Sequence, residues 1–179
     1  MKKLLVVFIF LCGFYSQSQE KKNVPLKNTQ KGFFAVDYLS VDMPTTDLGF
    51  NEIHMGLMGI HYNLAFDKFY TGLGMYGSVR GIRGGFFTLG VNAGFKNYLT
   101  DKVFIDTGIH FGGGGGAGAP DGGGAFILPH VNLGIQFKNF SFTTGYSYIN
   151  FFDKGAIENQ QLRLGLQIPI NFSSANMEN

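Results

Sequence analysis

The sequence contains no tryptophan, only one cysteine and few charged residues. Charged residues make up 15 % of the 179 positions, against about 25 % in soluble globular proteins. The one cysteine, Cys12, lies in an apolar N-terminal stretch that we expect to be removed. The remaining chain can then form no disulfide, thiolate metal site or cysteine nucleophile. These absences argue against an ordinary cytosolic enzyme.

Long apolar runs and a strong net charge are also missing. A membrane-spanning helix needs about 20 consecutive apolar residues, and no stretch beyond the N-terminus reaches that length. Removing Lys2 and Lys3 from the 14 basic residues leaves 12, equal to the 12 acidic residues. A near-neutral chain predicts no nucleic-acid partner.

The residues that are abundant are glycine and the aromatics. The chain has 27 glycines and 20 phenylalanines, and aromatic residues make up 16 % of it. Abundant glycine and aromatics, low charge and the lack of a spanning helix together favour a membrane β-barrel.

The N-terminus has the three regions of a secretory signal peptide. Lys2 and Lys3 form the positive region, residues 4–11 the apolar region, and Ser16 and Ser18 the small residues before a cleavage site. We therefore expect export through a cleaved signal peptide. The expected organisation is a signal peptide over 1–18, a polar periplasmic tail over 19–31, a barrel over 32–172 and a short C-terminal tail over 173–179.

From Phe33 to Phe172 the side chains alternate between apolar and small or polar, with a period of two residues. That period is typical of strands. In the clearest segment, 87–96, Phe87, Leu89 and Val91 alternate with glycine and polar residues. The least regular segment, near 50–64, changes its apolar face near Gly56, which indicates a bulge or a misplaced boundary. The segments predicted as strands lie near 33–41, 50–64, 69–80, 87–96, 103–112, 126–137, 140–148 and 162–172.

The second face of these segments decides between a soluble and a membrane barrel. The exposed face of a soluble barrel is normally rich in Lys and Glu. In this sequence the face opposite the apolar one consists mostly of Gly, Ser, Thr, Asn and Gln. The connections also alternate between short and long, the rule for outer-membrane barrels. We therefore predict an all-β fold, a closed antiparallel up-and-down transmembrane β-barrel of about eight strands. The residues expected to face lipid include Leu89, Val91, Leu133, Leu164 and Leu166.

This architecture resembles the small outer-membrane barrels, the group that contains the OmpA membrane domain. The last segment also resembles the C-terminal assembly signal of outer-membrane proteins, on Arg163, Gly165, Ile168, Ile170 and Phe172. The resemblance implies an outer-membrane location, contact with outer-membrane lipid and recognition by the barrel-assembly machinery. Residues 173–179 follow the last aromatic, whereas many relatives end there.

Sparse ionisable residues on the inward face predict a paired polar plug, because buried charges must be compensated. The residues are Asp37, Lys96, Asp106, His110, His130 and Arg163, and Glu52 and His54 join them if the second strand is placed correctly. Centring the connection of the fifth and sixth strands on its glycines places Asp106 opposite His130. Such a pair could orient a catalytic histidine toward Ser78, Ser141 or Ser147, although no motif surrounds these serines.

The remaining motifs predict no cofactor and no metal. The glycine run 112–124 matches a phosphate-binding pattern only trivially, since no helix and no Lys-Ser/Thr pair follow it. It is expected to be a surface loop or a strand extension. The leading hypothesis is a non-enzymatic outer-membrane protein with a structural, envelope or surface-binding role, whose long loops contact an extracellular ligand. The alternatives are a lipid A-modifying enzyme and a narrow, porin-like solute pore.

Overall fold

The structure, a computed structural model, describes residues 28–42, 54–81, 85–116, 123–152 and 158–174. The chain divides into two compact units, one of Thr29–Phe172 and one of Met1–Asn28 with Ser173–Asn179. The expected signal peptide and most of both expected tails fall outside the described residues and stay predictions. The unit Thr29–Phe172 contains the barrel.

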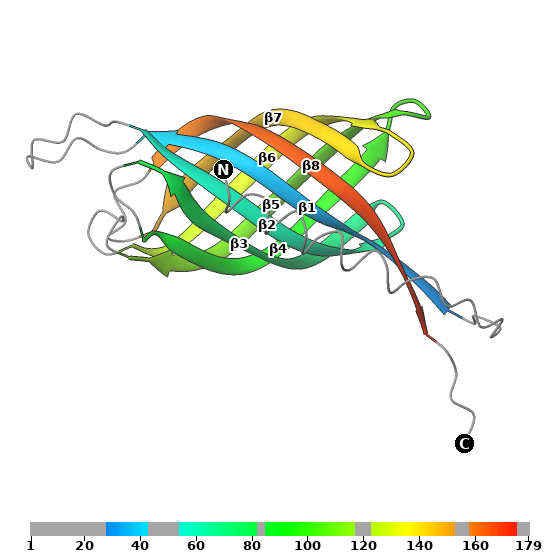
Figure 1. The fold of residues 1–179 in the computed structure, drawn as a ribbon, viewed down its shortest axis with the longest axis horizontal. Helices are drawn as coiled ribbons and strands as arrows, with labels where there is room; N and C mark the ends of the chain where they lie inside the picture. Colours follow the sequence, from blue (N-terminus) through cyan, green and yellow to red (C-terminus); the bar gives the residue numbers. More distant parts are fainter. Residues whose placement is uncertain (1–27, 43–53, 82–84, 117–122, 153–157, 175–179) are drawn as a thin grey trace, which may run out of the picture. The chain divides into compact units, whose positions relative to one another are not determined.

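The unit Thr29–Phe172 is a closed barrel in which each strand pairs with its sequence neighbour and β1 meets β8 (Figure 1). All seven pairings between consecutive strands are antiparallel. The predicted fold class is therefore confirmed. The strands are β1 (Asn28–Asp42), β2 (His54–Phe66), β3 (Phe69–Arg80), β4 (Phe87–Tyr98), β5 (Val103–Gly115), β6 (Gly124–Gln136), β7 (Ser141–Phe151) and β8 (Glu158–Ser174).

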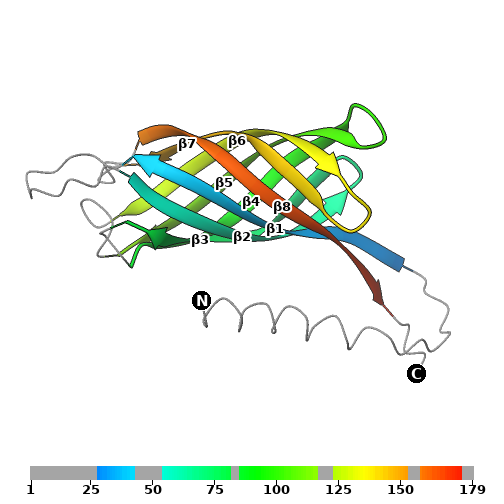
Figure 2. The same cartoon turned by 45° about the horizontal axis from the view of Figure 1, so that its top comes forward.

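The connections differ between the two ends of the barrel. Residues 67–68, 99–102 and 137–140 connect strands at the end where β1 begins and β8 ends, which we call the short-turn end. At the other end, the long-loop end, residues 43–53, 81–86, 116–123 and 152–157 connect strands (Figure 2). The expected alternation of short and long connections is confirmed. The glycine run extends β5 to Gly115 and starts β6 at Gly124, while residues 117–122 are not described.

The apolar side chains expected to face outward do so. Leu89, Val91 and Leu133 expose 57 %, 51 % and 49 % of their surface, and Leu164 and Leu166 expose 48 % and 39 %. Their sequence neighbours Thr88, Asn92 and Asn132 are buried in the interior. The outer surface of the barrel is thus apolar, and polar side chains lie in its interior. A soluble barrel has the opposite arrangement.

The second strand starts later than expected, at His54, and its side chains do not change face. Met55 and Leu57 point inward like His61 and Asn63 further along. A register shift does occur beside Gly56, but between β2 and β3, where Gly56 pairs with Arg80 and Leu57 with Ser78. The sequence pattern was irregular there because the inward side chains of β2 become apolar at the long-loop end.

Glycines that face the interior leave room for large side chains from neighbouring strands. A Cβ atom on Gly94 would lie 2.3 Å from the Tyr70 hydroxyl, and one on Gly59 would lie 2.1 Å from Asp37 Oδ1. Abundant inward glycine therefore does not leave open space, because tyrosine, histidine and phenylalanine rings occupy it. Side chains from neighbouring strands therefore fill the space beside these glycines.

Gly134 gives a direct test of this packing. A Cβ atom there would lie between 2.2 and 2.6 Å from three ring atoms of Phe104, which is fully buried. Gly134→Ala is expected to lower the free energy of unfolding by about 1–3 kcal/mol. Denaturant unfolding of the protein in detergent micelles measures the change.

The matched control is Gly77→Ala, since no atom lies within 4 Å of a Cβ at that position. Alanine in a strand is favoured over glycine by about 0.5–1 kcal/mol, so this variant should be neutral or slightly stabilising. Equal stability of the two variants would contradict the filled interior.

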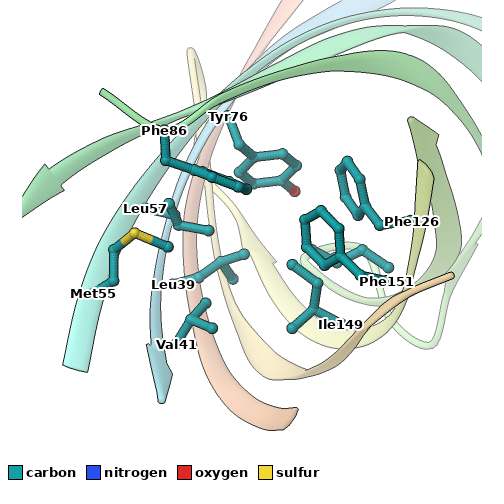
Figure 3. Packing of buried hydrophobic residues seen from close by; sticks show 10 residues of the cluster. Leu39, Val41, Met55, Leu57, Tyr76, Phe86, Phe126, Ile149 and Phe151 are labelled. Carbon is teal, nitrogen blue, oxygen red and sulfur yellow. The ribbon is translucent and has the colours of Figure 1, made fainter. Parts of the chain in front are cut away.

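An apolar cluster fills the interior at the long-loop end, and the sequence analysis did not predict it. Phe126 and Phe151 stack with ring centroids 4.9 Å apart, and Phe86 contacts Phe151 edge-on at 5.9 Å. Figure 3 shows the aliphatic members directed toward these rings. The cluster closes the interior at this end; its members are Leu39, Val41, Met55, Leu57, Tyr76, Phe86, Phe126, Leu128, Ile149 and Phe151.

Candidate functional site

The six ionisable residues expected in the interior, which we call the lumen, all point into it. Asp37, Asp106, His110, His130 and Arg163 are buried, with 1–8 % of their surface exposed. Lys96 is half-buried nearer the short-turn end. These six residues include two carboxylates and two permanent cations, so their summed formal charge is zero when His110 and His130 are neutral.

Asp37 is the centre of the first polar network. It forms an ion pair with Arg163, which joins the first and last strands where the barrel closes. The ring of His61 lies 3.3 Å from Asp37 Oδ2, and the Tyr76 hydroxyl donates to the same oxygen over 3.3 Å. A buried carboxylate needs such partners, because desolvation of an unpaired charge costs several kcal/mol, about the stability of a small domain.

Asn92 extends this network across neighbouring strands. Its Nδ2 donates to Asn63 Oδ1 over 3.1 Å and lies 3.2 Å from His61 Nδ1. Its Oδ1 accepts a hydrogen bond from His110 Nδ1 over 2.7 Å. These contacts place the His61 proton on Nε2, which faces Asp37, and the His110 proton on Nδ1.

Asp106 is the centre of the second polar network. The Tyr70 hydroxyl donates to its Oδ1 over 2.8 Å, and Gln167 Nε2 donates to its Oδ2 over 2.8 Å. The His130 ring lies 3.8 Å from Asp106 and 3.2 Å from the Tyr70 hydroxyl. Both carboxylate oxygens thus have neutral hydrogen-bond donors.

Lys96 lies on the short-turn side of this second network. Its Nζ donates to Gln167 Oε1 over 2.5 Å and lies 4.1 Å and 4.7 Å from the ring centroids of Phe33 and Phe104. Lys96 and Asp106 are cross-strand partners, yet within the described part of the chain Lys96 forms no ion pair. Gln167 separates the ammonium from the carboxylate by hydrogen bonding to both.

The expected register of β5 and β6 was wrong by two positions. Asp106 lies opposite Asn132, and His130 lies opposite Gly108. The expected pairing assumed that the turn is centred on the glycine run, but strand pairing follows the packing of the inward side chains. An offset of two positions keeps both residues on the inner face. Asp106 and His130 are therefore diagonal neighbours on adjacent strands, and His130 Nε2 lies 3.8 Å from Asp106 Oδ1.

The three serines considered as nucleophiles lie in different surroundings. Ser147 is the cross-strand partner of His130, so Asp106, His130 and Ser147 come together inside the lumen. All three are buried, which denies a lipid substrate access to them. Ser141 donates to Gln136 Oε1 over 2.7 Å, and Ser78 accepts from the Phe86 backbone over 3.3 Å.

A cavity of about 20 Å³ lies between the two networks. Three atoms of its lining residues are buried and have no hydrogen-bond partner among the described residues: His110 Nε2, His130 Nδ1 and Arg163 NH1. A single water needs about 10–15 Å³ of such volume and two to four polar partners. The cavity therefore has the size and the polar lining that suit one water, and it is too small for a solute.

One sequence-based assignment needs correction, another falls outside the described residues, and several network residues were missed. His54 lies outside the lumen beside Asp42, and Glu52 is not among the described residues. The inward histidine of β2 is His61, whose place could have been found by counting in twos along the strand. Tyr70 and Tyr76 were missed because their strand contains many glycines and their hydroxyls bond to other strands.

The described residues contain no group of three or more His, Cys, Asp or Glu residues that could hold a metal ion. They also contain no helix long and apolar enough to cross a membrane.

Comparison with known proteins gives structural similarity without sequence similarity. No protein-family model matches the sequence, and no curated protein matches it. The structure is similar to the Yersinia pestis outer membrane protein Ail in a phospholipid bilayer nanodisc, at 13 % identity over 78 % of this chain and 99 % of that chain, with a TM-score of 0.47. It is also similar to Neisserial surface protein A, at 10 % identity over 78 % and 96 % of the two chains, with a TM-score of 0.49. The closed eight-strand topology rests on the strand pairing of the chain itself.

Proposed function

We propose that this chain is an integral outer-membrane β-barrel that acts without catalysis, as a structural or surface-binding component of the cell envelope. The observation that carries the proposal is the uncharged apolar belt around the barrel. Every strand from β2 to β8 contributes exposed large apolar side chains to it. A soluble monomer rarely exposes an apolar patch larger than a few hundred Å², so lipid is the solvent that this surface requires.

Charged residues are confined to the ends of the belt. Along the outward-facing positions of the described strands, the acidic, basic and histidine side chains are Asp42, His54, Arg80 and Glu158, and each lies at a strand end on the long-loop side. Two outward threonines of the described strands donate to backbone carbonyls, Thr71 Oγ1 to Asn92 over 2.9 Å and Thr107 Oγ1 to Phe95 over 3.5 Å. Both features suit a hydrocarbon environment.

Exposed aromatics at the short-turn end support an orientation in the membrane. A girdle of Phe66, Phe69, Tyr98, Phe137 and Phe140 surrounds this end, with 41–64 % of each side chain exposed. Aromatic girdles mark membrane interfaces, and short turns face the periplasm in such barrels. The long loops would then face outward and contact an extracellular ligand, and assembly would use the expected signal on Arg163, Gly165, Ile168, Ile170 and Phe172.

The filled lumen favours this role over that of a solute pore. The apolar cluster closes the long-loop end, and the two polar networks occupy the middle of the lumen. An eight-stranded barrel has an interior just wide enough for side chains to fill it. A structural or binding role through the loops therefore fits the molecule better than transport.

Planar-bilayer recordings test the closed lumen. Purified protein in bilayers is expected to show no steady conductance above that of lipid alone, because buried apolar side chains occupy the lumen at the long-loop end. A reproducible single-channel current from pure wild-type protein would make the pore the better assignment. Mass spectrometry of lipid A with and without the protein tests the enzymatic alternative, and the expected result is no change in mass.

A further inference from the structure

A pocket opens into the barrel at the short-turn end. Its volume is about 200 Å³, below the roughly 300–1,000 Å³ of sites that enclose a drug-sized ligand. Residues of the barrel wall line it, among them Phe33, Tyr70 and Ser141, together with Lys68 of the β2–β3 turn. A pocket of this size admits one residue-sized group and leaves the rest of a ligand outside.

The charge of the pocket lining is positive. Lys31, Lys68 and Lys96 line the pocket, and Asp67 is the one carboxylate among its lining residues. Asp67 is exposed in the turn between β2 and β3. A concave surface with a net positive charge and apolar walls attracts anions.

Lys96 lies at the inner end of the pocket with donor capacity to spare. An ammonium group has three donors, and one of them bonds to Gln167 Oε1. Its other neighbours are the rings of Phe33 and Phe104, which are neutral. Asp106 does not line this pocket, because Tyr70 and Gln167 hold it on the inner side.

The uncharged residues of the pocket lining indicate which kind of anion it suits. Phe33, Phe69 and Tyr98 give the pocket apolar walls, while Ser141 and Gln136 add neutral polar groups. No arginine lines it, although a planar guanidinium fork is the usual means of binding phosphate through paired hydrogen bonds. A carboxylate that carries a small apolar side chain matches both the lysines and the walls.

We propose that this pocket binds the free carboxyl-terminal residue of a peptide through Lys96 and Lys68. In the proposed orientation the pocket faces the periplasm, so the peptide end would come from that side. The inference rests on the proposed function only for the expectation that the peptide comes from the periplasm. Binding itself can be measured on purified barrel in detergent micelles, whichever way the barrel is inserted in a membrane.

The test titrates the folded protein with N-acetyl-Ala-Ala carrying a free carboxylate, and separately with its C-terminal amide and with inorganic phosphate. Backbone amide shifts in NMR spectra report binding near Lys68, Lys96 and Ser141. We expect saturable binding of the free acid and at least tenfold weaker binding of the amide, because the amide lacks the negative charge that strengthens hydrogen bonds from an ammonium group.

The variants are Lys96→Met and Lys68→Met, with Lys138→Met as control. Lys138 is exposed in the β6–β7 turn at the same end but does not line the pocket. Both pocket variants should weaken binding of the acid about tenfold, and the control should leave it unchanged. Lys68 is exposed, so Lys68→Met decides the matter if Lys96→Met does not fold. Equal binding of acid and amide, tighter binding of phosphate, or no saturable shift would overturn the proposal.

Discussion

Replacing Val91 with arginine is expected to impair assembly of the protein in a bilayer severely. Val91 points outward in the middle part of β4, between Leu73 and Phe111 of the neighbouring strands, and 51 % of it is exposed. Arginine at a mid-membrane position costs about 2–4 kcal/mol. In a soluble barrel the same change at an exposed position would stay within about 0.5 kcal/mol. The size of the effect therefore distinguishes lipid from water around the barrel.

The measurement is the fraction of folded protein in outer-membrane preparations, followed by its mobility in unheated and heated detergent gels. The control is Asn139→Arg, which adds the same charge to the exposed turn between β6 and β7. Asn92→Arg is not a suitable control, because Asn92 bonds to His61, Asn63 and His110 in a filled lumen. Equal yields of Val91→Arg and Asn139→Arg would show that the belt does not lie in lipid.

Replacing Arg163 with methionine is expected to destabilise the barrel strongly by leaving Asp37 without its cation. Both side chains are buried, and His61 and Tyr76 are the remaining partners of Asp37. Removing one member of a buried ion pair typically costs about 3–5 kcal/mol, because the other charge stays desolvated. This pair also joins β1 to β8, so its loss weakens the contact that closes the barrel. Thermal unfolding in detergent, read from gel mobility, should show the lower stability.

A second substitution separates the charge effect from lost packing. Arg163→Met combined with Asp37→Asn removes both charges and keeps an oxygen for His61, so it should recover most of the lost stability. Lys96→Met should cost less than Arg163→Met, because Asp106 retains Tyr70 and Gln167 as donors. A double variant no more stable than Arg163→Met, or a larger loss for Lys96→Met, would contradict the assignment of partners.

The fold could be predicted because its evidence is local in the sequence. In a strand, successive side chains point to opposite sides, so the alternation of Leu89 and Val91 with Gly90 and Asn92 fixes which residues share a face. The nature of the two faces then separates a membrane barrel from a soluble one. The inward placement of Asp37, Lys96, Asp106 and Arg163 follows from the same count in twos.

The partners inside the lumen could not be predicted, because they depend on how the closed barrel sets its strand register. A shift of two positions keeps the same residues inside but changes which of them meet, as happened with Asp106 and His130. The ion pair of Arg163 with Asp37 arises only when the last strand meets the first.

By itself, then, the sequence determined the strands and the two faces of the barrel, because both follow from the direction of each side chain along the backbone. Only the tertiary structure decided the β5–β6 register, the contents of the lumen and the pocket at the short-turn end. It placed rings of Tyr70 and Phe104 in the space beside Gly94 and Gly134. It also brought apolar side chains from distant segments together at the long-loop end. These features depend on contacts between strands, which alternation within one strand does not specify.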